Sequence, residues 1–299
     1  MNTNMNMNSR TWPGVFTSVL CTGQRPSRLQ RKGRYTPESM AHPAKMLPAI
    51  AAQVIAAYTE PDDLVIDPMC GIGTTLVEAV HQGRPAIGVE YEARFARMAA
   101  GNLRHARTQG ASAASEVIHG DARTITTALP DLAGTAALIL TSPPYGAATH
   151  GQVRTGRDNS GGKIDKFHGR YSTDRANLAH RPTAELLAGF AQILNGCATL
   201  LCPGGVIAVT ARPFRVAGEL VDLPGQIVTT AEDHGLVLVD RLAALLCGLR
   251  DGHLVTRASF FQMVEARRLR EHGIPAMAVA HEDLLVFRPA SSLGDGGGR

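Results

Sequence analysis

The chain has few cysteines and no long apolar run, and both absences narrow what it can be. Its 299 residues include five cysteines, which are scattered and form no C-x-x-C pair. This usage argues for a reducing compartment and against a zinc site. No apolar stretch approaches the roughly 20 residues of a membrane-spanning helix, and the opening MNTNMNMNSR lacks the apolar core of a secretory signal. We therefore expect a cytoplasmic protein without a metal site or membrane contact.

Short apolar runs alternate with stretches of helical periodicity, which predicts an α/β fold with a parallel sheet. The predicted strands are 64–66, 86–89, 116–118, 137–140, 206–209, 236–246 and 284–287. The predicted helices are 48–58, 71–80, 95–106, 184–201, 259–272 and a helix over 216–234 that is broken at Pro224. We expect a flexible basic segment over 1–40, one domain over 41–289 with insertions at 146–182 and 247–281, and a flexible tail over 290–299.

A Ser-Pro-Pro-Tyr tetrapeptide, residues 142–145, follows the apolar run that predicts the fourth strand. Two adjacent prolines remove two backbone donors and fix two φ angles, so the segment cannot continue a sheet ladder. It predicts a stiff loop at the carboxyl end of the strand, where open α/β sheets bind ligands. Its hydroxyl, free carbonyls and aromatic ring suit a planar base that bears an amino group. The alternative is a proline-rich turn with a packed tyrosine.

A turn with two glycines follows the first predicted strand and opens a helix; its sequence is Asp67-Pro68-Met69-Cys70-Gly71-Ile72-Gly73-Thr74-Thr75. Gly71 and Gly73 allow a tight turn and a close approach of the backbone to a ligand. The third glycine of a dinucleotide fingerprint is replaced by Leu76, and there is no Gly-Lys-Ser/Thr of a P-loop. Phosphate binding is therefore not favoured, whereas a cofactor with an amino-acid moiety would tolerate Asp67.

Acidic residues also stand at the ends of the next two predicted strands. Glu90 ends the second strand, where an acid can hold both hydroxyls of a ribose. Asp121 follows the third strand, where a carboxylate could accept from an adenine amino group. Each acid alone is also compatible with a solvated strand end. Three acids at successive strand ends beside a glycine turn favour a nucleoside-bearing cofactor.

Together these motifs resemble the amino-methylating DNA methyltransferases, which use S-adenosylmethionine to modify N4 of cytosine or N6 of adenine. The resemblance covers about residues 40 to 288. The glycine turn is close to the family's D-P-F-C-G-S-G-T-T, although Met69 replaces the phenylalanine and Ile72 the serine. Neither change removes a glycine. The family implies a Rossmann-like class I methyltransferase fold, with a seven-stranded, mostly parallel sheet, an antiparallel last strand and helices on both faces.

The resemblance also implies roles for individual residues. The segment 42–45 would close over the methionine part of S-adenosylmethionine, Glu90 would hold the ribose and Asp121 the adenine. The implied cofactor-binding residues are Lys45, Asp67, Pro68, Cys70, Gly71, Gly73, Thr74, Thr75, Glu90 and Asp121. The implied catalytic residues are Ser142, Pro143, Pro144 and Tyr145.

The chemistry expected of this loop is direct methyl transfer to an exocyclic nitrogen. Ser142 and the Pro143 carbonyl would accept the two amino N–H bonds, which directs the nitrogen lone pair at the methyl group. Tyr145 would stack on a base that has left the duplex. Methylation at C5 of cytosine needs a nucleophilic cysteine, usually after a proline, and the chain has no Pro-Cys dipeptide. Ser-Pro-Pro-Tyr is closer to the cytosine-N4 version of the motif than to the Asp-Pro-Pro-Tyr usual for adenine-N6.

The charge distribution favours a nucleic-acid partner, and the family resemblance implies DNA rather than RNA. The net charge is only +4, but residues 1–45 hold seven Lys or Arg against one acid, and residues 146–182 hold seven against three. Either segment alone could be solvated chain; two of them around a candidate base site favour a phosphate backbone. Candidate phosphate contacts are Arg154, Arg157, Lys163, Lys166 and Arg170. Sequence readout would come from this loop, from the 247–281 insertion or from a partner protein.

Several alternatives stay open at this stage. The loop histidines His150, His168 and His180 fit no common metal spacing, and Arg267, Arg268 and Arg270 are compatible with an ordinary exposed helix face. The whole chain could instead methylate N2 of guanine in tRNA or rRNA, since those enzymes carry a similar Asn/Asp-Pro-Pro-Tyr. It could also be a catalytically silent module that binds nucleic acid or S-adenosylmethionine.

Overall fold

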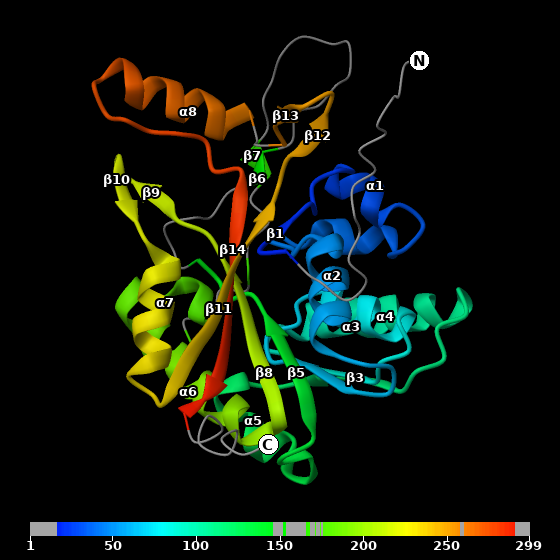
Figure 1. The fold of residues 1–299 in the computed structure, drawn as a ribbon. Helices are drawn as coiled ribbons and strands as arrows, with labels where there is room; N and C mark the ends of the chain where they lie inside the picture. Colours follow the sequence, from blue (N-terminus) through cyan, green and yellow to red (C-terminus); the bar gives the residue numbers. More distant parts are fainter. Residues whose placement is uncertain are drawn as a thin grey trace, which may run out of the picture.

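A computed structural model describes residues 17–145, 152–153, 166–167, 171, 174, 176–257 and 260–290. One eight-stranded sheet runs through the centre in the order β1-β11-β14-β8-β5-β2-β3-β4 (Figure 1). Its strands are β1 (Val19–Leu20), β2 (Leu64–Asp67), β3 (Ala86–Glu90), β4 (Ser115–His119), β5 (Ala136–Thr141), β8 (Leu201–Ala211), β11 (Leu236–Leu245) and β14 (His281–Pro289). All neighbours pair in parallel except β14, which is antiparallel to both β11 and β8. The seven predicted strands and the antiparallel last strand are confirmed.

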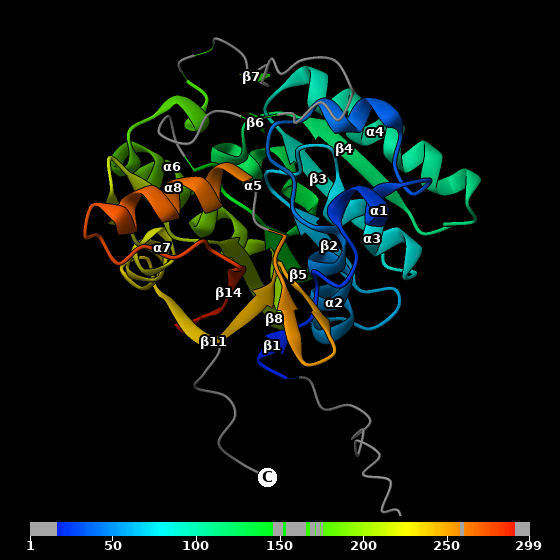
Figure 2. The same cartoon turned by 90° about the horizontal axis from the view of Figure 1, so that it is seen from above.

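Three helices pack on each face of the sheet, as predicted (Figures 1 and 2). One face is covered by α2 (Pro48–Tyr58), α3 (Thr74–His81) and α4 (Ala93–Thr108), and the other by α5 (Ile125–Ala128), α6 (Thr183–Leu200) and α7 (Leu223–Glu232). The side chains of β5 alternate between the two cores: Leu138 and Leu140 belong to one cluster and Ile139 to the other. A strand buried on both faces has no polar face, which is why β5 is a continuous apolar run in the sequence.

The chain before the first predicted helix is packed from residue 17 onward, whereas the sequence favours a flexible segment over 1–40. It forms β1, α1 (Ser27–Arg31) and a 3-10 turn over Pro37–Ala41. Arg34 and Tyr35 each place a polar atom 2.7 Å from the carboxylate of Glu78 on α3. Ser39 donates to Asn102 on α4 at 2.8 Å. This packing is largely polar, so it gives no apolar periodicity in the sequence; residues 1–16 lie outside the described residues.

The predicted helix over 216–234 is wrong in its first part. A hairpin of β9 (Phe214–Val216) and β10 (Glu219–Val221) precedes α7, which begins only at Leu223. Ala217 and Gly218 turn the hairpin at positive φ. Pro224 lies in the first turn of α7, where its missing N–H is not needed, and the Asp222 side chain caps that turn at Gly225. The proline therefore starts the helix and does not break it.

The described elements of the insertions stand above the carboxyl edge of the sheet (Figure 1). Between β11 and β14 the chain forms a hairpin of β12 (Gly248–Arg250) and β13 (His253–Val255), followed by α8 (Phe260–Glu271), which confirms the predicted helix there. Within the 146–182 insertion the described residues include a short antiparallel pair, β6 (Gln152–Val153) and β7 (Lys166–Phe167). Among the described residues there is no helix with the length and apolar content needed to cross a membrane.

Candidate active site

A cavity of about 1260 Å³ lies at the carboxyl ends of the parallel strands. It brings together nearly all of the candidate cofactor and catalytic residues named from the sequence. Those that line it are Lys45, Asp67, Pro68, Cys70, Gly71, Thr74, Thr75, Glu90, Asp121, Ser142, Pro143, Pro144 and Tyr145. Gly73 does not line it and instead precedes α3 as its N-cap. The glycine turn and the Ser-Pro-Pro-Tyr loop, which are separate in the sequence, therefore line the same cavity.

The glycine turn has the backbone conformation that its sequence predicts. Gly71 and Gly73 have φ values of +55° and +77°, a region that other L-residues rarely adopt. A Cβ added at Gly71 would lie 3.1 Å from Nε2 of His42, so the segment before α2 packs directly on this turn. The turn thus keeps its backbone open to the cavity on one side and is covered by His42 on the other.

Asp67, at the end of β2, is buried and accepts three hydrogen bonds. Its carboxylate oxygens accept from Thr75 Oγ1 at 2.7 Å, from Thr141 Oγ1 at 2.9 Å and from the Met69 N–H at 3.1 Å. Burial raises the pKa of Asp67 to about 6, although these three donors oppose the shift. Asp67 therefore joins the glycine turn to the residue just before Ser142.

Glu90, at the end of β3, accepts from two backbone groups. The N–H of Gly71 donates to one oxygen at 2.8 Å and the N–H of Glu92 to the other at 2.8 Å. Burial raises the pKa of Glu90 to about 7 despite these bonds. The carboxyl is fixed against the glycine turn and retains lone pairs on the cavity side for hydroxyl donors.

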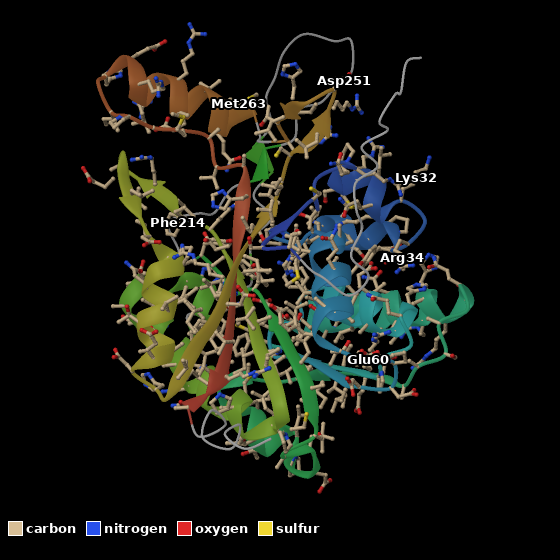
Figure 3. All side chains as sticks on the ribbon, viewed as in Figure 1. Lys32, Arg34, Glu60, Phe214, Asp251 and Met263 are labelled. Carbon is tan, nitrogen blue, oxygen red and sulfur yellow. The ribbon has the colours of Figure 1, made fainter. Side chains whose placement is uncertain are left out.

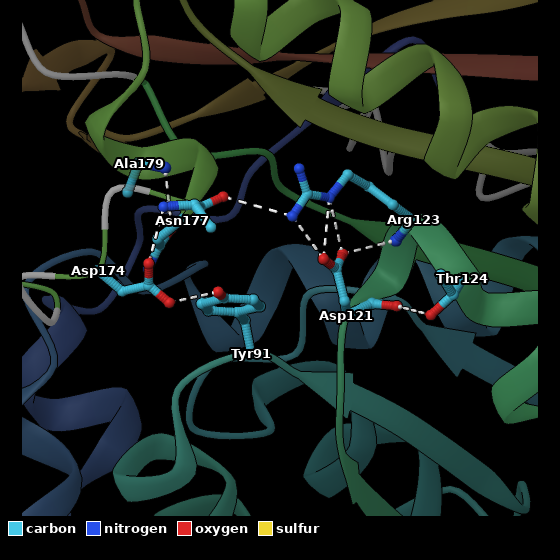
Figure 4. Close-up of polar contacts among 8 residues, drawn as sticks. Tyr91, Asp121, Arg123, Thr124, Asp174, Asn177 and Ala179 are labelled. Carbon is cyan, nitrogen blue, oxygen red and sulfur yellow. Dashed lines mark hydrogen bonds and ion pairs between the residues drawn. The ribbon is translucent and has the colours of Figure 1, made fainter.

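Asp121, after β4, is engaged by a neighbouring cation (Figure 4). Both of its oxygens accept from the Arg123 guanidinium, at 2.5–3.0 Å, and one also accepts from the Arg123 N–H at 2.9 Å. Burial opposes ionisation here, but the bonds from Arg123 prevail and the pKa of Asp121 lies below its usual value. The sequence prediction treated Asp121 as a free acceptor and did not foresee Arg123.

A strap, which we define as residues 174 and 176–179, lies across this part of the cavity (Figure 4). Tyr91 donates its hydroxyl to Asp174 at 2.5 Å, and Asn177 donates its amide to Glu92 at 2.7 Å. Arg123 also donates to the Ala176 carbonyl at 3.4 Å. The strap is therefore tied to the ends of both β3 and β4.

Lys45 and His42, in the segment before α2, also line the cavity. The Lys45 ammonium donates to the carbonyls of His42 and Met40 and forms no ion pair with any residue that the structure describes. Burial and the nearby Arg31 lower the pKa of Lys45 to about 8. Burial and Lys45 lower the pKa of His42 to about 3, so its ring is neutral and packs 4.1 Å from the Phe95 ring.

The Ser-Pro-Pro-Tyr loop occupies the middle of the cavity. The Tyr145 ring stands edge-on to Phe214, with ring centroids 6.0 Å apart, and the Arg212 guanidinium carbon lies 5.7 Å from the Tyr145 centroid. Phe214 belongs to the β9–β10 hairpin beside α7 (Figure 3). Burial raises the pKa of Tyr145, so the phenol is neutral. The tyrosine is held by packing, as expected of a rigid stacking platform or of a structural turn.

Several other sequence predictions fall elsewhere. Arg154, Arg157, Lys163 and Arg170, with His150 and His168, lie outside the described residues, and of Lys166 only the backbone is described, in β7. Arg267 and Arg268 pair with Glu271 and Glu265 along an exposed face of α8. No group of three or more metal-ligating side chains occurs in the described part of the chain.

Sequence reasoning missed a second set of cavity residues. They are Tyr91, Arg123, Tyr171, Asn177, Arg212, Phe214 and Glu282. Tyr91 and Arg212 directly follow β3 and β8, so the rule that strand ends face the site could have identified both. The others reach the cavity from loops and hairpins whose positions no local pattern gives.

The fold is that of the class I methyltransferases. The overall structure resembles the crystal structure of TrmN from Thermus thermophilus, with a TM-score of 0.50 and 17% identity, covering 87% of this chain and 53% of that one. At that identity the likeness shows the fold alone. In the observed sheet, β14 lies between β11 and β8 and is antiparallel to both, which agrees with the antiparallel last strand that the family resemblance implies.

The first third of the chain is similar in sequence to known DNA methylases. Residues 3–101 match a family described as DNA methylase, of the N6/N4 amino-methyltransferase type. The type II methyltransferase M.ScaI of Streptomyces caespitosus is 37% identical over 70 residues, which are 23% of each chain. M.HinfI of Haemophilus influenzae is 32% identical over 90 residues, 30% of this chain and 23% of that protein. In this region the chain is similar to DNA amino-methyltransferases, and the matched segments span only about a quarter of the relatives' length.

S-adenosylmethionine is the cofactor of this family and fold, and the donor set of the cavity fits it. A cofactor with an amino acid at one end and a nucleoside at the other needs a cation for its carboxylate and a hydrogen-bond acceptor for its ribose hydroxyls. It also needs a stretch of protein backbone that no side chain shields. Lys45 is a cation without an acidic partner among the described residues, Gly71 opens the backbone, and Glu90 is an oriented acceptor. Asp121 fits less simply, because Arg123 occupies its oxygens.

Proposed function

We propose that the protein transfers a methyl group from S-adenosylmethionine to the exocyclic amino group of a base in DNA, at N4 of cytosine in preference to N6 of adenine. One observation supports this most directly. Ser142, Pro143 and Tyr145 line the same cavity as Gly71 and Glu90. A base bound at the first set would therefore meet a methyl donor bound at the second.

The cofactor would be held by the residues that surround the glycine turn. Lys45 would bind the methionine carboxylate, and Glu90 would accept from the ribose hydroxyls. Asp121 would accept from the adenine amino group only through the lone pairs that Arg123 leaves free, while the Arg123 guanidinium holds the carboxylate in place. When bound, S-adenosylmethionine supplies an electrophilic methyl group on a sulfonium.

The chain's own residues would prepare the amine for attack. Ser142 and the Pro143 carbonyl would accept hydrogen bonds from the two N–H groups of the amine. This geometry withdraws the nitrogen lone pair from conjugation with the ring and directs it at the methyl group. Tyr145, fixed by Phe214, would stack on the base, which leaves its duplex to reach the cavity. No covalent intermediate is required; among the described cysteines only Cys70, within the glycine turn, lines the cavity, and it is buried.

DNA is the proposed acceptor because of the family relationship and the basic segments. The preference for cytosine rests on the serine of Ser-Pro-Pro-Tyr. Sequence recognition would come from the insertions at 146–182 and 247–281, or from a partner protein. Arg212 and Arg257 line the cavity on that side and provide positive charge near an incoming backbone.

Methyl transfer from labelled S-adenosylmethionine to unmethylated DNA tests the proposal, with tRNA and rRNA as parallel acceptors. Mass spectrometry of the digested nucleosides then identifies the product. N4-methylcytosine is expected. N2-methylguanine from RNA would instead establish the RNA alternative, and cofactor binding without transfer to any acceptor would establish a silent relative.

A further inference from the structure

We propose that Glu282 reads the target base, by hydrogen-bonding the ring nitrogen next to the amino-bearing carbon: N3 of cytosine or N1 of adenine. This inference rests on the proposed function, because it concerns the base that Ser142 and Tyr145 would hold. No motif in the sequence pointed to Glu282. Its position in the sheet and its lack of a partner do.

The sheet topology brings Glu282 to the catalytic loop. It is the second residue of β14, and because β14 is antiparallel its beginning lies at the edge where β5 and β8 end. Asp283 pairs with Ala211, the last residue of β8, so Glu282 stands level with Arg212. Glu282 lines the same cavity as Ser142 and Tyr145.

The Glu282 carboxyl accepts no hydrogen bond and forms no ion pair with any residue that the structure describes. The next residue, Asp283, differs in this respect, because it pairs with Arg241 at 2.9 Å. The groups that face Glu282 are the Arg212 guanidinium, which attracts its charge without pairing, the neutral Tyr145 phenol, and Ala244 of β11 across the sheet. Glu282 is half-buried and lines the cavity, so its carboxyl is available to a ligand there.

A neutral carboxyl would suit the two amino-bearing bases of the proposal. Burial raises the pKa of Glu282, although Arg212 opposes the shift, so the neutral form is more favoured than in water. A neutral carboxyl has one O–H donor and one carbonyl acceptor. N3 of cytosine and N1 of adenine are acceptors beside an amino group, so the O–H would donate to the ring nitrogen. Guanine presents an N–H at N1 and would need the ionised carboxylate.

Because the two kinds of base need different forms of the Glu282 carboxyl, the Glu282→Gln variant distinguishes between them. Glu282→Gln retains a donor and an acceptor, and it should keep kcat/KM on DNA within about threefold of the wild type. Glu282→Ala removes both and should lower kcat/KM by roughly 10- to 100-fold, the effect of losing one base-reading contact. Cofactor affinity, measured by calorimetry, should be unchanged in both variants. Glu271→Gln, on the exposed face of α8, is the matched control.

Two results would overturn the assignment. Glu282→Ala with wild-type kcat/KM would show that the base does not contact this side chain. Glu282→Gln as impaired as Glu282→Ala would show that an anion is needed, as for a guanine N–H. Failure of the wild-type protein to methylate DNA would instead count against the proposed function, and it is detected separately in the same assay.

Discussion

Thr141 donates its hydroxyl to the carboxylate of Asp67 at 2.9 Å, although the two residues are 74 positions apart in the chain. Thr141 ends β5 and precedes Ser142, while Asp67 ends β2 and begins the glycine turn. The bond is buried, and Asp67 is held from the other side by Thr75. The spacing between the two motifs is therefore fixed by a side-chain network as well as by strand pairing.

Thr141→Val should destabilise the protein and reduce transfer. The change keeps the shape of the side chain but leaves one Asp67 oxygen with fewer donors in a buried site, at a cost of about 1–3 kcal/mol. Urea unfolding measures the loss. Thr230→Val on the exposed face of α7, where the hydroxyl bonds only within its own helix, should change the free energy of unfolding by less than about 0.5 kcal/mol. Equal effects of the two changes would contradict the role given to the Asp67 network.

Cofactor affinity should depend on pH through Glu90 and Lys45. The pKa of Glu90 is raised to about 7, so acidification protonates the acceptor for the ribose hydroxyls and weakens binding below that pH. The pKa of Lys45 is lowered to about 8, so alkali removes the ammonium and weakens binding above that pH. Calorimetry from pH 5.5 to 9.5 should therefore show the tightest binding between the two values.

Two variants separate the limbs of that profile. Glu90→Gln should weaken binding near neutrality and flatten the acid limb, while Lys45→Met should flatten the alkaline limb. An unchanged acid limb in Glu90→Gln would show that another group controls it.

Tyr145→Ala should abolish transfer while leaving cofactor affinity nearly unchanged. Stacking of an aromatic side chain on a base contributes about 1–3 kcal/mol, and the alanine variant also loses the platform that orients the base. Tyr145→Phe keeps the ring and should retain most of the activity. Single-turnover transfer and calorimetry give the two readouts; a parallel loss of cofactor binding in Tyr145→Ala would refute the assigned role.

Arg123→Ala should loosen the strap without unfolding the protein. Arg123 joins Asp121 to the Ala176 carbonyl and is partly exposed, so its loss should cost less than about 1 kcal/mol of global stability. Hydrogen exchange at the amides of Asn177 and Ala179 should accelerate. Arg181→Ala, which removes an exposed pair with Glu185 nearby, provides the comparison and should leave those amides protected.

The sequence predicted those parts of the site that lie in continuous motifs. Apolar runs located β2, β3 and β5, and the rule that ligands bind at strand ends placed Asp67, Glu90 and Ser142 together. The two- and three-residue strands β1, β9 and β10 were missed, because so few residues show no alternation. The pairing of Asp121 with Arg123 and the ties of the strap depend on side-chain geometry between distant segments, which periodicity does not contain.

The position of β14 between β11 and β8 has a consequence for how such proteins diversify. The chain leaves the sheet after β11, forms β12, β13 and α8, and returns as β14 beside the catalytic loop. The glycine turn and Glu90 lie in the other half of the sheet, on β2 and β3. Under the proposed function, a different excursion between β11 and β14 would change the residues beside the target base and leave Gly71 and Glu90 in place.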